Sequence, residues 1–251
     1  MTFQKKLFAL LILLLSFQLK AQITINNTIY TPNQLINGVL VPPMSGVTIS
    51  NVAYRGVYGD NSKYQVGYFS TATTTLSQMG FANGIVLTTG KTSDIPAPLG
   101  TPTTPPPLMD EFYADCTPGL VQQDGTCSTF VNDLAVLADA QGYYNATILE
   151  FDFVTVHTSV TFRYVFGSEE YNNGVDSNYQ CTEFNDKFGF LISGPGISGG
   201  QGFSNDARNM AILPNGSQVS INSVNDGVIG PDGDSSACLL SNPNWVQNVV
   251  S

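Results

Sequence analysis

An acidic segment after the most regular β-type stretch of the sequence carries the side chains best suited to bind a metal ion. Within 18 residues it gathers many carboxylate and amide side chains, among them Glu169, Glu170, Asp176, Asn178, Glu183, Asn185 and Asp186. Calcium binds about six to eight oxygen ligands from such groups and from backbone carbonyls. We therefore predict a calcium site, with calcium as the cofactor and the ligands Glu169, Glu170, Asp176, Asn185 and Asp186. In the alternative interpretation, Glu169 and Asp186 cap turns and bind backbone amides.

Catalytic chemistry has weaker candidates. Glu150 and Asp152 lie two residues apart, so a strand would place them on one face, at a spacing that suits paired glycosidase acids. The strand register proposed below places Arg163 opposite Asp152, which favours a structural ion pair. His157 is the single histidine and falls in a predicted turn, where a histidine is usually solvated. We therefore expect no enzymatic activity and rank a polysaccharide hydrolase last.

Three further features could bind ligands. The glycine-rich segment 194–202 lacks the lysine and the following helix of a phosphate-binding loop, so we interpret it as a flexible loop. The aspartates in segment 226–236 alternate with glycine, which suits calcium, but no tandem repeat supports them and a turn-rich loop is favoured: Asp226, Asp232 and Asp234. Several aromatic side chains could stack on sugars, although rim packing is the more common role: Tyr113, Tyr143, Tyr144, Tyr171, Tyr179 and Trp245.

The composition and the first residues indicate export. Of 251 residues, 42% are hydrophobic, which is enough for a sizeable core. With 9 Lys and Arg against 19 Asp and Glu, the net charge is −10, which argues against a nucleic-acid partner. Residues 1–21 predict a cleaved secretory signal, because Lys5 and Lys6 precede an apolar run, 7–15, that is too short to span a bilayer. We expect a secreted or cell-surface protein with no membrane span after cleavage.

Four cysteines lie in the part of the chain that would be exported, where disulfides are favoured: Cys116, Cys127, Cys181 and Cys238. Three pairings are possible. We favour a short clip, Cys116–Cys127, together with Cys181–Cys238. The cysteines show no CxxC spacing, which argues against a zinc site.

Strand signals dominate the chain, and the clearest lies in residues 149–166. Apolar residues alternate on both sides of His157 and Thr158, so a hairpin closed there would place Phe153 opposite Phe162 and Asp152 opposite Arg163. One register then satisfies an aromatic face and a charged face, and a slip by one residue would break both. This pattern predicts an antiparallel sheet with one packed face and Asp152–Arg163 as a structural pair.

A second hairpin is predicted around the turn Asn215-Gly216, with Ile212 opposite Val219 and Met210 opposite Ile221. The remaining predicted elements are strands at 23–25, 47–58, 85–87 after an Asn83-Gly84 turn, and 188–192, and two short helices. One helix is capped by Thr31-Pro32 and ended by Gly38, and the other begins at Asn132 or Asp133; residues 91–108 form a long loop. We predict an all-β fold, a two-sheet antiparallel sandwich of jelly-roll or lectin-like type with one or two short helices.

Several segments resemble the choice-of-anchor L domain family. The resemblance rests on FRYVFGSEEY at 162–171 and FNDKFGF at 184–190, supported by YTP at 30–32 and GIVLTTG at 84–90. It covers the chain from about residue 23 to the end, so residues 22–251 are expected to form a single domain. The chain lacks the family's usual final strands and a sorting signal, so we expect a domain that is incomplete at its C-terminus.

The resemblance implies a domain of a large secreted or surface protein of bacteria, with presumed adhesion roles and no catalytic residues to carry over. We therefore expect a non-enzymatic β-sandwich module for adhesion or surface assembly, stabilised by calcium. The expected partner is a surface glycan or protein. The alternative is a carbohydrate-binding, lectin-like module that uses the acidic segment and neighbouring tyrosines.

Overall fold

The computed structural model describes part of the chain. Its described residues are 23–56, 65–71, 80–90, 92, 131–138, 146–168, 171, 180–182, 185–225, 229, 233 and 238. The predicted secretory signal, the Cys116–Cys127 pair and nearly all of the predicted loop 91–108 lie outside these residues. Within the described part, no helix is long and apolar enough to cross a membrane.

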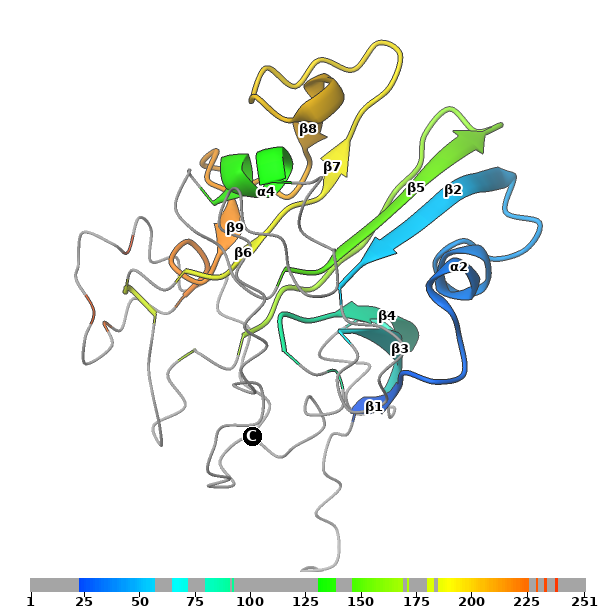
Figure 1. The fold of residues 1–251 in the computed structure, drawn as a ribbon, viewed down its shortest axis with the longest axis horizontal. Coiled ribbons are helices and arrows are strands. Elements are labelled where there is room, and N and C mark those ends of the chain that lie inside the picture. Colours follow the sequence, from blue (N-terminus) through cyan, green and yellow to red (C-terminus); the bar gives the residue numbers. More distant parts are fainter. Residues whose placement is uncertain are drawn as a thin grey trace, which may run out of the picture.

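Strands in antiparallel pairs make up most of the regular secondary structure of the described residues (Figure 1). The strands are β1 (Ile23–Asn26), β2 (Val47–Arg55), β3 (Val66–Thr71), β4 (Asn83–Leu87), β5 (Ile148–Thr155), β6 (Lys187–Phe188), β7 (Leu191–Ile192), β8 (Arg208–Asn209) and β9 (Val219–Ser220). The helices are α2 (Pro32–Gln34), the π-helix η1 (Leu35–Leu40), α4 (Val131–Leu137) and the 3₁₀-helix η3 (Ser204–Asp206). This confirms the predicted all-β class, while the two-sheet sandwich stays a prediction.

The first helix forms where the sequence predicts it. The Thr31 hydroxyl accepts a hydrogen bond from Gln34 N at 3.3 Å, and Thr31 N donates to Gln34 Oε1 at 2.9 Å, which completes a capping box. The predicted end at Gly38 is wrong, because η1 continues the helix to Leu40. Leu35 and Ile36 at its start are fully buried and anchor the helix.

The order β1-β3-β4 forms a three-stranded sheet, and it confirms the predicted strands at 23–25 and 85–87. The predicted Asn83-Gly84 turn is wrong, because both residues belong to β4, and Gly84 lies opposite Phe69 in the ladder. A Cβ atom at Gly84 would lie 2.7 Å from the Phe69 ring. Glycine is therefore needed here for the close approach of a ring rather than for a turn.

β2 and β5 form the longest ribbon, which projects from the rest of the molecule (Figure 1). This confirms the predicted strand at 47–58 as far as Arg55. A register shift lies between Ser50 and Ala53, where Asn51 adopts a positive φ of 52°. The predicted pairing of β5 with residues 160–166 is wrong, because these residues form no ladder and β5 pairs with β2 alone among the described strands. Alternation along β5 defines the two faces of the strand, but it does not select the neighbouring strand.

Residues 160–166 nevertheless run back beside β5 without forming a regular strand (Figure 1). The rings of Phe153 and Phe162 lie 6.1 Å apart, as the predicted facing pair requires. Phe162 also lies 5.1 Å from Phe190, and Tyr164 lies 5.0 Å from Phe188. The predicted aromatic face therefore exists, and it joins this segment to the β6–β7 region through edge and tilted ring contacts.

The second hairpin turns where predicted but with a register shifted by one residue. Leu213 N donates to Ser217 O at 2.8 Å and Ile212 pairs with Gln218, so the loop has three residues, 214–216, and Gly216 has a φ of 90°. A shift of one residue exchanges the two faces of a strand. Met210 is accordingly exposed, whereas Ala211 and Leu213 are buried with Val219.

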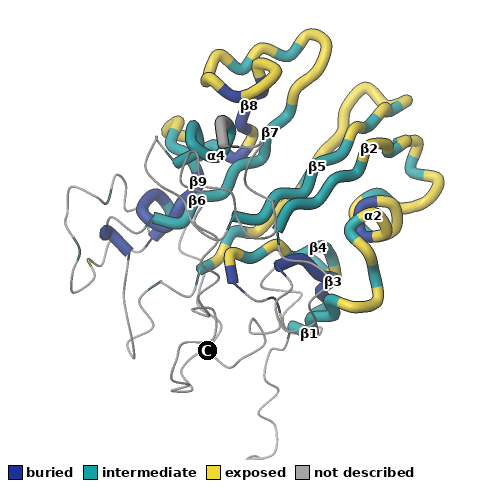
Figure 2. Tube along the Cα trace, in the orientation of Figure 1, coloured by how far each residue is buried: buried dark blue, intermediate teal, exposed yellow. Residues whose placement is uncertain are grey.

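Phe166, Phe188, Phe190 and Val224 pack around this buried cluster. α4 confirms the predicted helix through Leu134 and Leu137, although it begins at Val131, so Asp133 lies inside the helix rather than at its cap. Leu137 packs over Gly189, where an added Cβ atom would lie 3.1 Å from it. Figure 2 shows a continuous run of buried residues in the turn that follows β9.

Candidate functional site

The structure describes only part of the predicted calcium segment. Asn185 and Asp186 are described, whereas the other predicted ligands lie outside the described residues: Glu169, Glu170 and Asp176. The same holds for the second acidic segment, since Asp226, Asp232 and Asp234 also lie outside. The predicted site can therefore be examined only at the point where its segment joins β6.

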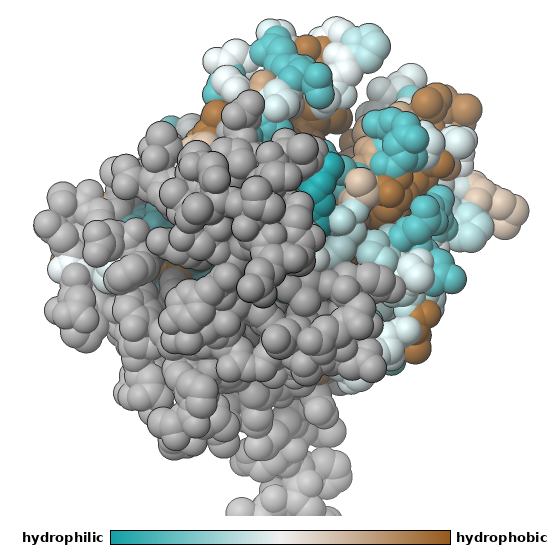
Figure 3. Space-filling view, viewed as in Figure 1, coloured by the Kyte–Doolittle hydropathy of each residue, from teal (hydrophilic) through white to brown (hydrophobic). Residues whose placement is uncertain are grey.

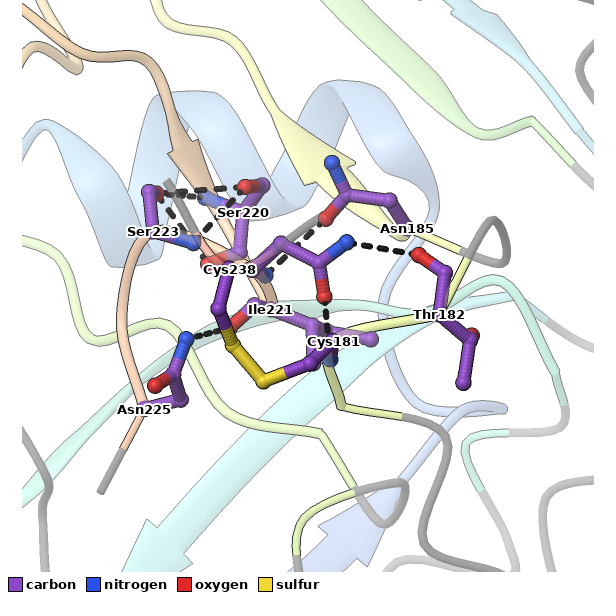
Figure 4. The surroundings of a disulfide bond; sticks show 9 residues. Cys181, Thr182, Asn185, Ser220, Ile221, Ser223, Asn225 and Cys238 are labelled. Atoms are coloured by element: carbon purple, nitrogen blue, oxygen red, sulfur yellow. Dashed lines mark hydrogen bonds between the residues drawn. A yellow bond between two sulfur atoms is a disulfide. The ribbon is translucent and has the colours of Figure 1, made fainter. Parts of the chain in front are cut away.

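At this point the chain forms a buried polar network around a disulfide bond (Figure 4). Cys181 and Cys238 are joined, with their Cα atoms 4.6 Å apart, which is the second of the two pairs favoured from the sequence. Thr182, Ser220, Asn222, Ser223 and Asn225 are all buried beside it. We call these five residues with Asn185 and the disulfide the asparagine network.

Asn222 is the centre of this network. Its Oδ1 atom accepts a hydrogen bond from Cys181 N at 2.7 Å, and its Nδ2 atom donates to Thr182 O at 2.7 Å. Its backbone N donates to Asn185 Oδ1 at 3.0 Å. Asn222 therefore provides hydrogen-bond partners for groups of residues 181, 182 and 185, near the end of the acidic segment.

The turn that carries Asn222 is held by its own side chains. Ser220 N donates to Ser223 Oγ at 2.9 Å, and Ser223 N donates to Ser220 Oγ at 3.2 Å. Ile221 N donates to Asp186 O at 3.1 Å, and Asn225 Nδ2 donates to Ile221 O at 3.0 Å. Serine and asparagine side chains compete well for backbone groups in turns, which explains why the chain leaves the strand after β9.

This role of Asn222 was not predicted from the sequence, in which residues 219–222 were interpreted as part of a strand. The stretch Val-Ser-Ile-Asn-Ser-Val-Asn contains two serines three residues apart and two asparagines. That density of side chains that form Asx and Ser/Thr turns was the available signal for a turn.

Asp186 and Asn185 differ in their environment. Burial raises the pKa of the Asp186 carboxyl above its ordinary value, because desolvation disfavours the charged form. The Asn185 side-chain oxygen accepts the hydrogen bond from Asn222 N, so Asn185 binds a backbone amide as the alternative interpretation expected of Glu169 and Asp186. Among the described residues, no three His, Cys, Asp or Glu side chains gather into a metal-binding group.

The two candidate catalytic carboxylates have structural partners. Glu150 forms an ion pair with Arg55 of β2, and Asp152 Oδ2 accepts a hydrogen bond from Asn51 Nδ2 at 2.6 Å. The predicted Asp152–Arg163 pair does not form. Arg163 donates to Gly80 O at 3.1 Å and lies 4.7 Å from the centre of the Phe81 ring. The reason is that β2, rather than residues 160–166, is paired with β5.

The candidate nucleophilic groups are likewise engaged. His157 Nε2 lies 2.8 Å from Ser45 O, which requires its N–H to donate to that carbonyl. Residues 196–200 read Gly-Ile-Ser-Gly-Gly and so fit the spacing Gly-x-Ser-x-Gly, but no strand-to-helix elbow surrounds them in the described structure. The Ser198 hydroxyl donates to Asp206 Oδ2 at 2.8 Å instead.

Groups of the glycine-rich segment donate hydrogen bonds to the carboxylate of Asp206. Its Oδ1 atom accepts hydrogen bonds from Gly200 N at 2.9 Å and from Gly199 N at 3.2 Å. These bonds, first that from Gly200 and then that from Ser198, lower the pKa of the Asp206 carboxyl. The segment is a loop, as predicted, and the amides that could have bound a phosphate bind this carboxylate.

Of the aromatic residues proposed for sugar stacking, Tyr171 alone is described, and it is half-buried. Burial raises the pKa of its hydroxyl above the ordinary value. Within the part of the chain that the structure describes, the hydroxyl has no hydrogen-bond partner. Tyr171 is thus placed inside the fold, and the remaining candidates lie outside the described residues: Tyr113, Tyr143, Tyr144, Tyr179 and Trp245.

Comparison with known proteins gives one result. No curated protein and no solved structure matches the chain. A model of the choice-of-anchor L domain family matches residues 24–250, which is nearly the whole sequence. The segments that carry the resemblance, 162–171 and 184–190, lie inside this match. The chain therefore belongs to the choice-of-anchor L domain family.

Proposed function

We propose that this domain is a non-enzymatic module for adhesion or surface assembly outside the cell. Membership of the family indicates a domain of a secreted or cell-surface protein, and such surface domains are not typically enzymes. The observation that carries the proposal is the engagement of the polar groups suited to catalysis. Glu150, Asp152, His157 and Asp206 each contact a structural partner within the described residues.

Paired glycosidase acids illustrate the point. Such a pair needs one carboxyl group that donates a proton and one that is free to face the substrate. Glu150 is instead bound to the Arg55 guanidinium, and Asp152 to the Asn51 amide. Both bonds join β5 to β2, so these side chains support a rigid ribbon.

Two assays test this proposal. Beads coated with residues 22–251 should attach under flow to a glycan- or protein-coated surface, whereas albumin-coated beads should not. The same protein should release no sugar from a panel of polysaccharides. Release of sugar that is abolished by Glu150→Gln would contradict the non-enzymatic assignment. If the coated beads attach to none of the surfaces, adhesion is contradicted.

We also propose that calcium stabilises the domain, with Glu169, Glu170, Asp176, Asn185 and Asp186 as ligands. The observation that favours this proposal is the environment of the Asp186 carboxyl, because burial disfavours its charged form. A cation beside it would offset that cost. Asn185 Oδ1 already accepts one hydrogen bond, but an amide oxygen has two lone pairs and can also face an ion.

A melting curve with and without calcium tests this second proposal. A ligand that binds the native state must raise the melting temperature, so about 1 mM CaCl₂ should raise it and a chelator should reverse the rise. Asp186→Asn should abolish the rise, whereas Asp206→Asn should retain it. An unchanged wild-type melting temperature would exclude the calcium site, and glycan binding that is lost with the chelator would support the lectin-like alternative.

A further inference from the structure

Hydrophilic and hydrophobic residues lie side by side on the described surface (Figure 3), and among the hydrophilic ones an asparagine followed by glycine can react with water alone. Asparagine is a thermolabile residue, and a glycine after it has no side chain to obstruct the approach of its own backbone nitrogen. The structure describes three of the four such pairs in the sequence, and Asn173-Gly174 lies outside it. The described pairs are Asn37-Gly38, Asn83-Gly84 and Asn215-Gly216.

Local structure separates the three described pairs, because all three asparagines are exposed. Asn37 lies in η1, and its Nδ2 atom donates to Asn33 O at 3.1 Å and to Asn33 Oδ1 at 3.0 Å. Asn83 and Gly84 belong to β4 and are held in the ladder with β3. In both places regular structure fixes the backbone, so the nitrogen of the glycine cannot turn toward the side-chain carbon unless a turn of helix or a strand opens first.

Asn215 lies instead in the exposed three-residue loop 214–216 of the second hairpin. Its Oδ1 atom accepts a hydrogen bond from Ser217 N at 2.9 Å, which is an Asx turn. Such a turn folds the side-chain amide back over the peptide group that follows it. The same hydrogen bond polarises the side-chain carbonyl and would stabilise the negative charge that develops on Oδ1 when a nucleophile attacks Cγ.

The backbone nitrogen of Gly216 is the nucleophile closest in the chain to this carbon. It donates to Leu213 O at 2.8 Å, so the loop has to open before the nitrogen can attack. Opening an exposed loop breaks local bonds and leaves the strands on either side in place, and such openings cost the least free energy in a folded protein. The loop 214–216 is therefore the described Asn-Gly position at which the reaction meets the smallest barrier from the fold.

We propose that Asn215 is a modification site at which the folded domain deamidates spontaneously and forms isoaspartate. A bond forms between Gly216 N and Asn215 Cγ, the bond from Cγ to Nδ2 breaks, and ammonia leaves with the proton of Gly216 N. Water then adds to one of the two carbonyl carbons of the succinimide ring and breaks its bond to the ring nitrogen. The product is aspartate when the original peptide bond is restored and isoaspartate when the chain runs through the side chain. The reaction consumes only water and involves no oxidation or reduction.

The two products differ in what they do to the hairpin. Aspartate keeps the length of the loop and an acceptor oxygen for Ser217 N. Isoaspartate adds one carbon atom to the main chain of a loop whose length sets the register of the hairpin. The bond from Leu213 N to Ser217 O at 2.8 Å closes this loop, and Leu213 is buried with Ala211 and Val219. Isoaspartate therefore weakens the closing bond and the packing of Leu213.

Peptide mapping by mass spectrometry tests the site. Residues 22–251 are incubated in mildly alkaline buffer and sampled over time, and Asn215 should convert about tenfold faster than Asn37 or Asn83. The rate should rise with pH, because base removes the proton of the attacking nitrogen. In urea that unfolds the chain, the three positions should convert at similar rates, since the fold no longer protects two of them. Conversion of Asn37 or Asn83 in the folded protein as fast as that of Asn215 would overturn the proposal.

Matched variants test the effect on the hairpin. A methyltransferase specific for isoaspartate should label the aged wild type at residue 215, and hydrogen exchange should show lost protection of the Leu213 amide. Asn215→Ser, aged in the same way, cannot form the succinimide and should keep the protection. Fresh Asn215→Asp should also keep it, because the loop length is unchanged. Full protection in aged protein that carries isoaspartate at residue 215, or equal loss in aged Asn215→Ser, would overturn the proposed effect.

Discussion

The side chain of Asn222 holds the backbone of Cys181, 41 residues earlier in the chain, through a 2.7 Å hydrogen bond from Cys181 N to Asn222 Oδ1. The same amide donates to Thr182 O at 2.7 Å. Cys181 adopts a positive φ of 65°, a conformation that is uncommon for a residue other than glycine, and it is fully buried. The Asn222 contacts therefore stabilise this unusual backbone conformation at the residue that carries the disulfide.

Asn222→Asp should destabilise the domain by about 2–3 kcal/mol. The substitution keeps the shape and the acceptor but removes the donor to Thr182 O, and it places a carboxylate in a buried site. Urea unfolding at neutral pH measures the loss. Asn215→Asp is the matched control, because Asn215 is exposed and acts only as an acceptor for Ser217 N. Equal stability of the two variants would show that the asparagine network does not depend on its donor.

Removal of the disulfide should cost about 4 kcal/mol, the chain-entropy value for a bridge that spans 57 residues. The double variant Cys181→Ala/Cys238→Ala allows this to be measured by urea unfolding. The buried groups near the bridge are mostly polar, and hydrogen bonds between such groups add only about 1 kcal/mol each. The network should therefore open when the bridge is lost.

The control for the bridge is Cys116→Ala/Cys127→Ala, which removes the same number of thiols and retains Cys181–Cys238. It should keep the amide protons of Cys181 and Asn222 protected from hydrogen exchange, whereas Cys181→Ala/Cys238→Ala should lose the protection at residues 181 and 222. Protection that survives without the 181–238 bridge would show that the hydrogen bonds suffice alone.

The register of the second hairpin can be tested with two substitutions in one strand. Leu213 is 8% exposed and packs in the cluster with Ala211 and Val219, so Leu213→Ala should cost about 2–4 kcal/mol. Met210 is 54% exposed, so Met210→Ala should change the free energy of unfolding by about 0.5 kcal/mol or less. The register predicted from sequence would reverse this order, and urea unfolding of the two variants distinguishes them.

Local signals allowed much of the fold to be predicted. The Thr31 cap, the Asn215-Gly216 turn and the alternation in β5 each depend on residues within a few positions of one another. The errors arose where the outcome depends on loop length or on distant chain. A three-residue loop instead of a two-residue loop shifted the second hairpin, and both lengths are compatible with Asn-Gly.

Distant pairing could not be read from the sequence. The ion pair between Arg55 and Glu150 joins residues 95 apart, and either β2 or residues 160–166 offered β5 a plausible neighbour. The candidate site shows the same limit. The residue types in the sequence indicated the acidic segment. The partners of Asn222, however, lie about 40 residues away in the sequence and become its neighbours only in the fold.

Asp186 and Asp206 should give the stability of the domain opposite pH dependences. Burial raises the pKa of Asp186 above 3.8, so the native state retains a proton that the unfolded chain has released. Stability therefore falls as the pH rises from 3.8 through the raised pKa. For Asp206, hydrogen bonds lower the pKa below 3.8, so stability falls as the pH decreases from 3.8 through the lowered pKa.

Urea unfolding between pH 2 and pH 7, in the presence of a calcium chelator, tests both signs. Asp186→Asn should remove the fall above pH 3.8 and make the variant relatively more stable near neutrality, because an amide carries no charge to desolvate. Asp206→Asn should reduce the fall below pH 3.8, because this position then has no carboxylate to protonate. If Asp186→Asn leaves the slope above pH 3.8 unchanged, or makes the fall steeper, the Asp186 carboxyl is solvated or paired. Its burial would then no longer support the proposed calcium site.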